Sequence, residues 1–463
     1  MSTFEHDLAD AVDGRILGSD DDITRYVVDW TGRWRGSARA VVRPRTVAEV
    51  VAVVDVCRTH AVPIVPQGGN TGMVGGSVPD QRCVVVSTEG LTETSGIGAD
   101  GTITVGAGVT LTALRDVAHA AGWATGLHIA SADSATIGGI ASTNAGGARV
   151  LRYGSARARI IGLRTVLANG TIVDRRNALP KDNTGYDLVD LFVGAEGTLG
   201  IVTDVTWQLV EPNTRTLVAV VRFDDADAAV AALPTLRRLP GVEALEWVRG
   251  RDIDRVAAFL DASPPMSTDG FWIFAAMGAT DTNLFDTAAP VVEQLVISHG
   301  LSDGDVVVAE APNEQRALWA FREQMTEAIA SDGVPVKLDV AVPVDRFAAT
   351  CERVQSAVRT ADPDARTVLF GHFAEANFHI SVLPPAGAGE YDDHTADRIE
   401  DAVLAEIVAA DGTISAEHGV GRAKQRWLER QRGQVQYDVM TQIKSALDPE
   451  QLLNPGVLFP ERR

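Results

Sequence analysis

The sequence contains the stretch PQGGNTGMVGG at residues 66–76, directly after the β-branched segment VPIV (62–65). Two more glycine-rich stretches follow, SADSATIGGIASTNAGGARVLRYG at 131–154 and GAEGTLGIVT at 194–203. Glycine lets a backbone approach a ligand closely, and successive N–H groups in such a loop can bind an anion. Taken alone, each stretch also fits a purely structural loop. Three of them at strand ends in one α/β region favour a groove for a long cofactor that contains a diphosphate.

Hydrophobic periodicity around these loops indicates an α+β protein. TVAEVVAVVDVCRTH (46–60) has apolar residues at helical spacing and begins with a Thr-x-x-Glu capping box. Strands are expected at 83–87 and 102–106, so helices and strands alternate in the N-terminal half. Beyond Pro212, segments in which apolar and polar residues alternate as in strands predict a second, sheet-rich region at 271–277, 305–309, 337–344 and 367–382. Helices are expected at 393–410 and 437–447.

Length and charge narrow the classes of function. At 463 residues, with 45% of them hydrophobic, the chain can form two or three domains with sizeable cores. A formal net charge of −21 disfavours nucleic acid and anionic membranes as partners. The scattered Cys57, Cys83 and Cys351 suit a reducing compartment. Without an apolar run of roughly 18–20 residues or a secretory signal, we expect no transmembrane segment and a cytoplasmic protein.

The segment TVLFGHFAEANFHISVLPP (367–385) carries the sharpest chemical signal. It reads as two strands joined near AEAN, and the strand period of two places His372 on one face and His379 with Ser381 on the other strand's face. If these faces coincide, two imidazoles meet, and Glu417 in ISAEHGVGRAKQ can supply a carboxylate. Two imidazoles and a carboxylate are a common ligand set for a divalent metal. Histidines that pack structurally and a carboxylate at a helix start are the alternative.

A second cluster suits a carboxylate ligand. LWAFREQMTEAIASDGVPVKLDVAVP (318–343) is expected to continue a helix that runs from about Glu314 to Ala330, which places Arg322 and Thr326 four residues apart on one face. Lys337 then begins the next strand. A guanidinium binds a carboxylate through two parallel hydrogen bonds, so this set can act as an anion clamp. A solvated helix face with charge pairing is the alternative.

The glycine-rich stretches, in this order and with GYDLVDLFVG (185–194) before the third, resemble the flavin-binding segments of the vanillyl-alcohol oxidase/p-cresol methylhydroxylase (PCMH) family. The similarity covers nearly the whole chain and is greatest to the D-2-hydroxyacid dehydrogenase branch. It implies a PCMH-type FAD-binding domain of two subdomains at 1–212, a substrate (cap) domain with an antiparallel sheet at 213–415, and a helical C-terminal segment at 416–463 that returns to the flavin. The FAD is expected to be bound noncovalently.

The same resemblance implies residue roles. The positions expected to bind FAD are Pro66, Gly68, Gly69, Asn70, Thr71, Gly72, Ser77, Ser134, Thr136, Gly138, Gly139, Asn144, Gly147, Glu196, Gly200, Ile201, Val202 and Asn454. GHFAEANFH and SAEHGVG resemble the motifs in which the branch binds zinc, manganese or another divalent ion, which assigns His372, His379 and Glu417 as ligands. His418 becomes the catalytic base and also a substrate contact, while Arg322, Thr326, Lys337 and Ser381 bind substrate.

Four departures from the branch affect this assignment. Ala374, Glu375 and Ala376 stand where relatives have Gly, Asp and Gly, and Ser381 replaces an Asn. Ala374 and Ala376 add two methyl groups that tighten the hairpin turn, and Glu375 is one methylene longer than Asp. These changes can alter the choice of metal or the fit of the substrate. The Ser381 replacement weakens the assignment of a particular hydroxyacid, but the types of metal ligand are retained.

The resemblance implies a dehydrogenase that oxidises a small anionic D-2-hydroxyacid, first of all D-2-hydroxyglutarate, to the 2-oxoacid, with metal assistance and hydride transfer to flavin N5. An electron-transfer flavoprotein or a quinone-type compound is the expected electron acceptor, and a homodimer is possible. A D-lactate or glycolate dehydrogenase or oxidase, and a flavin-dependent alkyl transferase without net oxidation, use the same scaffold and remain alternatives.

Overall fold

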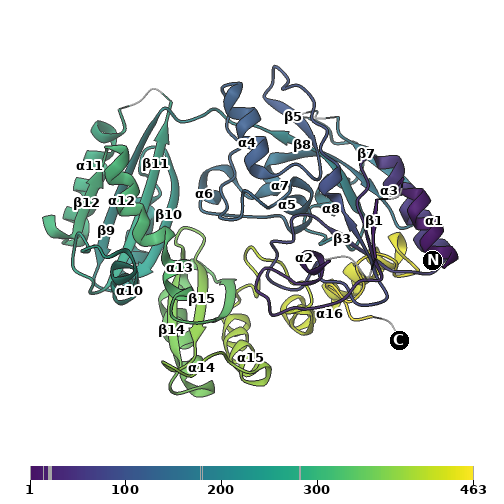
Figure 1. The fold of residues 1–463 in the computed structure, drawn as a ribbon. Helices are drawn as coiled ribbons and strands as arrows, with labels where there is room; N and C mark the ends of the chain where they lie inside the picture. The colour runs from purple at the N-terminus through teal and green to yellow at the C-terminus, as the bar shows by residue number, and fades with distance from the viewer. Residues whose placement is uncertain are drawn as a thin grey trace. The chain divides into compact units, whose positions relative to one another are not determined.

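A computed structural model describes residues 2–13, 15–18, 23–177, 179, 181–280 and 283–461 (Figure 1). Contacts within the chain divide it into two units. The first unit comprises Met1–Gly147, Tyr153–Glu211 and Glu417–Arg463, and the second comprises Ala148–Arg152 and Pro212–Ala416. The C-terminal residues therefore group with the N-terminal ones.

The first sheet of the first unit is mixed and has the strand order β1-β2-β4-β3. Its strands are β1 (Ile16–Leu17), β2 (Ala40–Val42), β3 (Ile64–Gln67) and β4 (Val84–Ser87); α1 (Thr3–Ala11) precedes β1, and α2 (Thr24–Val27) and α3 (Val47–Thr59) precede β2 and β3. β2 and β3 both run parallel to β4. The predicted helix start is confirmed in α3, because the Thr46 side chain accepts a hydrogen bond from the Glu49 N–H.

The second sheet of this unit is antiparallel and has the order β5-β8-β6-β7. Its strands are β5 (Thr102–Gly106), β6 (Ile160–Val166), β7 (Ile172–Arg175) and β8 (Ile201–Gln208). The helices here are α4 (Leu111–Ala120), α5 (Ile137–Thr143), α7 (Ala156–Arg159) and α8 (Leu188–Phe192), while most of α6 (Val150–Tyr153) groups with the second unit. Helix α5 and strand β8 pack together around a core that includes the buried Trp207.

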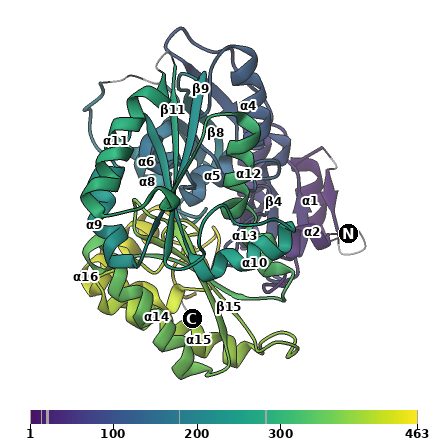
Figure 2. The same cartoon turned by 90° about the vertical axis from the view of Figure 1, so that its left-hand side faces the viewer.

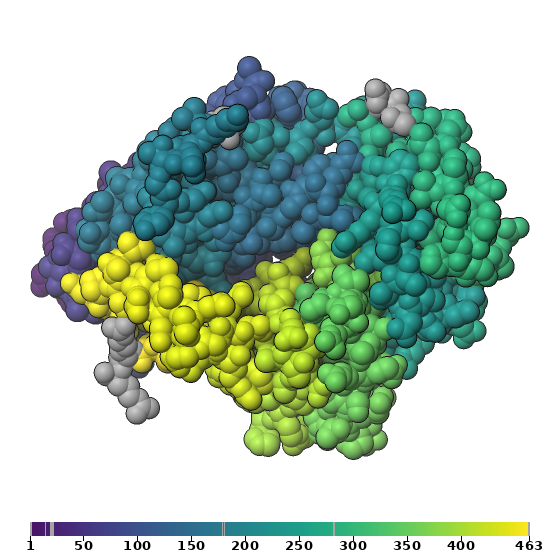
Figure 3. Space-filling view, turned by 180° about the vertical axis from the view of Figure 1, so that it is seen from behind, coloured from purple at the N-terminus to yellow at the C-terminus, as the bar shows by residue number. Residues whose placement is uncertain are grey.

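A buried ion pair anchors the C-terminal end of the chain. Helix α16 (Gln425–Leu447), which is interrupted by Gly433 at φ +74°, ends beside Asp448. Lys444 Nζ lies 2.5 Å from Asp448 Oδ2 and donates to the Thr198 carbonyl at 2.7 Å, while Asp448 accepts the Leu453 N–H. In the space-filling view these yellow residues pack against blue residues of the same unit (Figure 3).

The second unit is built on a seven-stranded antiparallel sheet with the order β12-β9-β11-β10-β14-β15-β13. The strands are β9 (Arg215–Phe223), β10 (Val242–Arg249), β11 (Phe271–Ala279), β12 (Val306–Ala309), β13 (Val336–Ala341), β14 (Arg366–His372) and β15 (Asn377–Leu383). This large sheet, together with the two sheets of the first unit, confirms the predicted α+β class.

Helices cover both faces of this sheet. On one face α10 (Gly250–Leu260), α12 (Pro312–Glu323) and α13 (Met325–Ala330) share a core with Trp272, Phe274 and Phe370. The remaining helices are α9 (Ala226–Leu236), α11 (Leu284–His299), α14 (Phe347–Ala361) and α15 (Asp393–Ala409), of which α14 and α15 lie side by side (Figures 1 and 2). Among the described residues, no helix combines the length and the apolar character needed to cross a bilayer.

Candidate metal centre and cofactor loops

The histidine hairpin forms as predicted, and its register explains why the two rings meet. β14 pairs with β15 so that Phe370 lies opposite His379. Directly opposed residues in an antiparallel pair share a face, and His372 is two residues from Phe370, so both histidines lie on one face. Their ring centroids are 5.0 Å apart with an interplanar angle of 83°. Ala376 in the turn has φ +48°, a conformation that the glycine of relatives adopts more easily.

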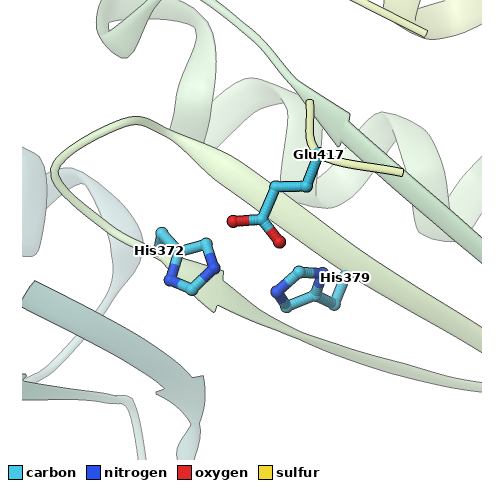
Figure 4. Close-up of side chains that lie close together, drawn as sticks. All are labelled: His372, His379 and Glu417. Carbon is cyan, nitrogen blue, oxygen red and sulfur yellow. The ribbon is translucent and has the colours of Figure 1, made fainter. Parts of the chain in front are cut away.

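Glu417 completes a set of three possible metal ligands. One ligand atom from each of His372, His379 and Glu417 lies within 4.8 Å of the others. Figure 4 shows the carboxylate of Glu417 directed toward the two rings. Glu417 comes directly after Ala416, whose N–H donates to Asp339 Oδ2 at 3.1 Å on the neighbouring strand β13. Two imidazole nitrogens and one carboxylate oxygen fit a zinc or manganese ion by ligand type.

Two buried acids that were not predicted stand behind the rings. Glu246 on β10 lies opposite His372, and its Oε1 is 2.6 Å from His372 Nδ1. Asp339 on β13 lies opposite His379, with Oδ1 3.6 Å from His379 Nδ1. Burial acts to raise the pKa of Glu246, but the charges of His372 and Arg322 outweigh it and lower the pKa below its usual value. Acids set among apolar residues of a strand, as in VEALEWV, are the sequence signal that points to such residues.

The anion clamp is arranged differently from the prediction. A continuous helix over 314–330 is wrong, because α12 ends at Glu323 and α13 starts at Met325. The break at Gln324 lets α13 bury Met325 and Ile329 in the core of the sheet face. Thr326 therefore lies beyond the break, on α13, and does not follow Arg322 on one continuous helix face.

The two cations of the clamp come to the face of the sheet that carries the histidines. Arg322 NH2 lies 2.6 Å from Glu246 Oε2, and its guanidinium carbon is 4.8 Å from the centre of the Phe370 ring. Lys337 lies opposite Ser381 in the β13–β15 pair, and Ser381 in turn lies opposite Val368. Arg322 Nε is buried and has no hydrogen-bond partner among the described residues, which suits a binding site for an anion.

The three glycine-rich stretches converge in the first unit. A Cβ on Gly69 would lie 1.8 Å from the Ser134 carbonyl oxygen, and one on Gly68 would lie 2.2 Å from Thr136 Oγ1, so the first and second stretches are in direct contact. The third stretch joins them, since the Glu196 N–H donates to the Ser142 carbonyl at 2.7 Å. Glycine is required at these close approaches.

Several polar residues predicted to bind FAD also make hydrogen bonds that brace the loops. Asn70 Nδ2 donates to the carbonyls of Arg25 and Val28, and Asn70 Oδ1 accepts from Ser77. Asn144 Oδ1 likewise accepts from the Ser155 hydroxyl and the Arg157 N–H. These hydrogen bonds give partners to backbone carbonyl and N–H groups that no helix or sheet would otherwise pair.

Glu196 and Asn454 connect distant segments in the same way. The two carboxylate oxygens of Glu196 accept the N–H groups of Val420 and Gly421, each at 2.8 Å. Asn454 Nδ2 donates to the Gly76 and Glu196 carbonyls at 2.8 and 2.7 Å. Asn454 Oδ1 is buried without a hydrogen-bond partner in the part of the chain that the structure describes, which fits a bound polar group such as FAD.

The other predicted cofactor positions occupy the same loops and their flanks. Pro66 lies near the carboxyl end of β3. Ile201 and Val202 are the first two residues of β8, and both side chains are buried. The remaining positions lie in the three stretches themselves: Thr71, Gly72, Gly138, Gly139, Gly147 and Gly200. His418 lies between Glu417 and Gly419 in the irregular segment before α16, next to the residues that Glu196 holds.

Family models match both parts of the chain. The model described as an FAD binding domain matches residues 38–175, and the model described as the C-terminal domain of FAD linked oxidases matches residues 212–458. A protein named D-2-hydroxyglutarate dehydrogenase from Xanthomonas citri pv. viticola is 35% identical over 440 residues, which covers 95% of this chain and 93% of the relative. The mitochondrial D-2-hydroxyglutarate dehydrogenase of Bos taurus is 33% identical and covers 97% and 82%.

Solved structures resemble the fold over almost the full chain. p-Cresol methylhydroxylase with substrate bound has a TM-score of 0.79 at 18% identity, with 99% of this chain and 96% of the other covered. An alkyldihydroxyacetonephosphate synthase has a TM-score of 0.74 at 15% identity, with 98% and 86% covered. At these identities the likeness concerns the fold alone, and it confirms the expected PCMH-type architecture.

Proposed function

The chain belongs to the family of FAD-linked oxidases with a PCMH-type fold, and from this premise we propose that it oxidises a D-2-hydroxyacid, preferably D-2-hydroxyglutarate, to the 2-oxoacid. The names of its relatives support the substrate class. The observation that carries the proposal is the convergence of Arg322 and the two histidines on one face of the large sheet. A dicarboxylate needs both a cation for one end and a polarising centre for the other.

Each chain residue has a proposed task at this face. Arg322 and Lys337 bind and orient the carboxylate remote from the reacting carbon, and Ser381, opposite Lys337, and Thr326 serve as hydroxyl donors. His372, His379 and Glu417 would hold a divalent ion, zinc or manganese, which would supply a Lewis acid at the hydroxyacid end of the substrate. His418 accepts the hydroxyl proton as the general base. The FAD, when bound, supplies the hydride acceptor.

An anaerobic absorbance titration tests the function. The FAD- and metal-loaded protein is titrated with D- and L-2-hydroxyglutarate, D-lactate, glycolate and D-malate, and bleaching of the flavin is followed before air is admitted. We expect bleaching by D-2-hydroxyglutarate at the lowest concentration. Bleaching by D-lactate or glycolate alone would indicate a monocarboxylate enzyme, and rapid reoxidation in air would indicate an oxidase. A flavin that none of these acids bleaches would contradict the proposal.

Replacing His418 with alanine is expected to slow flavin reduction by the substrate by about 10²–10⁴-fold, the usual contribution of a positioned general base. The FAD content is expected to stay unchanged, because the bonds of Glu196 to Val420 and Gly421 hold this segment through its backbone. Stopped-flow absorbance measures the rate, and the exposed His119 replaced with alanine serves as the control. An undiminished rate would remove His418 from the reaction.

Substrate affinity is expected to depend on pH through Lys337. Burial lowers the pKa of Lys337 below its usual value, with a smaller opposing effect of Glu327. The lysine binds a carboxylate only while protonated, so KM for D-2-hydroxyglutarate should rise as the pH increases through that lowered pKa. A Lys337→Arg variant keeps its charge and should show a flat KM over the same range. Identical pH profiles of KM for the two proteins would exclude Lys337 as the titrating contact.

We further propose that FAD is bound noncovalently and that electrons pass to an electron-transfer flavoprotein or a quinone-type acceptor. The homodimer and the cytoplasmic location remain predictions from the sequence. Release of the flavin on denaturation in acid tests the noncovalent binding of FAD. Size-exclusion chromatography of the purified protein tests the homodimer.

A further inference from the structure

We propose that Glu246 is a positioning residue shared by the metal centre and the anion clamp. One carboxylate oxygen holds the ring of His372 and the other holds the guanidinium of Arg322. The inference rests on the proposed function, because it gives that function a single residue through which binding of the ion and binding of the substrate influence each other.

The strand register places Glu246 between its two partners. It lies directly opposite His372 in the β10–β14 pair, with Oε1 2.6 Å from His372 Nδ1. From the other side, α12 brings Arg322 NH2 to 2.6 Å from Oε2. The Glu246 side chain is 1% exposed, and those of His372 and Arg322 are 10% and 12% exposed. A carboxylate so buried requires charged or hydrogen-bonding partners, and here both oxygens have one.

The contact to Nδ1 determines which nitrogen of His372 is available to an ion. A ring that donates its Nδ1 proton to a carboxylate presents Nε2 as its lone-pair donor, and the carboxylate fixes the ring's orientation and raises its basicity. Asp339 stands behind His379 in the same relation, but at the longer distance of 3.6 Å and with its oxygens also accepting from Asn377 and Ala416. Glu246 is therefore the closer support, and its second oxygen also contacts Arg322 of the clamp.

The two roles predict opposite effects on the two ligands. Removing the charge of Glu246 loosens His372 and should weaken binding of the metal. It also removes the anion that neutralises Arg322, so the clamp should attract a free carboxylate more strongly. A residue that served only to stabilise the fold would, when changed, weaken both.

The experiment compares Glu246→Gln with wild type in the full-length, FAD-loaded protein after removal of metal with a chelator. Zinc affinity, measured by competition with a chromophoric chelator, is expected to fall about 10–100-fold. Affinity for succinate, a dicarboxylate that cannot be oxidised at a hydroxyl, is expected to rise by up to about tenfold in the metal-free protein by calorimetry. Glu243→Gln is the matched control, since Glu243 is an equally buried acid on the same strand whose contacts include Asn213, Arg149 and Arg152.

Unchanged zinc affinity, or zinc and succinate affinities that fall together, would overturn the inference. If Glu246→Gln does not fold, nitrogen NMR of the zinc-loaded wild type decides, because a His372 that binds through Nδ1 is incompatible with the proposed contact. Failure of the proposed function looks different: zinc and succinate would respond as described while no hydroxyacid reduces the flavin.

Discussion

A His379→Ala protein is expected to lose tight metal binding and to reduce its flavin with D-2-hydroxyglutarate about 10³-fold more slowly. The substitution leaves two of the three candidate ligands, His372 and Glu417. Lewis-acid assistance at a substrate oxygen is worth several kcal/mol, and each 1.36 kcal/mol is a factor of ten in rate. Metal content after dialysis and the rate of anaerobic bleaching measure the two effects.

The same protein should retain its FAD, because His379 belongs to the second unit and the positions predicted to bind FAD belong to the first. Replacement of the exposed His394 with alanine is the control for the loss of any histidine. A His379→Ala protein that kept one equivalent of metal and reduced its flavin at the wild-type rate would show that the ion, if any, is bound elsewhere. The catalytic assignment of the cluster would then be wrong.

The hairpin shows what local sequence patterns can predict. Strand alternation places His372 on the same face as Phe370, and residues 367–385 predicted that the two rings meet if the faces of the two strands coincide; the observed register, with Phe370 opposite His379, meets that condition. The α3 helix was predicted in the same way, because its capping box lies within its own first turn. Both features depend on contacts between residues that are close in the sequence.

Glu246 and Asp339 show where such patterns stop. These acids lie behind the histidines only because β10 pairs with β14 and β13 pairs with β15. β10 lies more than a hundred residues before β14 in the chain. Sequence periodicity gives the face of a strand but not its neighbour. The break at Gln324 was missed for a related reason, since the helical pattern over 314–330 is continuous and only packing against the sheet makes the chain bend there.

The glycine-rich loops show a third limit. Their resemblance to flavin-binding segments located the cofactor region, which the family models support at residues 38–175. It carries no information on which of these side chains also hold the loops together, because that depends on contacts between distant segments. Asn70 and Asn144 direct their polar atoms at neighbouring backbone groups, because glycine-rich loops contain many N–H and carbonyl groups outside any helix or sheet.

Replacing Glu196 with alanine is expected to loosen the segment that carries Glu417 and His418. The carboxylate of Glu196 accepts the N–H groups of Val420 and Gly421, each at 2.8 Å. Hydrogen bonds to a charged group are worth about 1.5–3 kcal/mol each, so the amide exchange of residues 414–424 should accelerate by at least about tenfold per lost bond. Hydrogen-exchange mass spectrometry measures this directly, and flavin reduction should fall with it.

Glu196→Gln separates the bonds from the bulk of the side chain. The amide keeps one acceptor oxygen, but its NH2 group faces an N–H donor, so we expect faster exchange than in wild type and slower exchange than in Glu196→Ala. Glu211→Ala, at an exposed acid of the same unit, should leave exchange at 414–424 unchanged. If Glu196→Ala also left that exchange unchanged while FAD was lost, Glu196 would act on the cofactor itself, as the resemblance first implied. Accelerated exchange with FAD retained would instead make it the residue that holds the base and the third ligand in place.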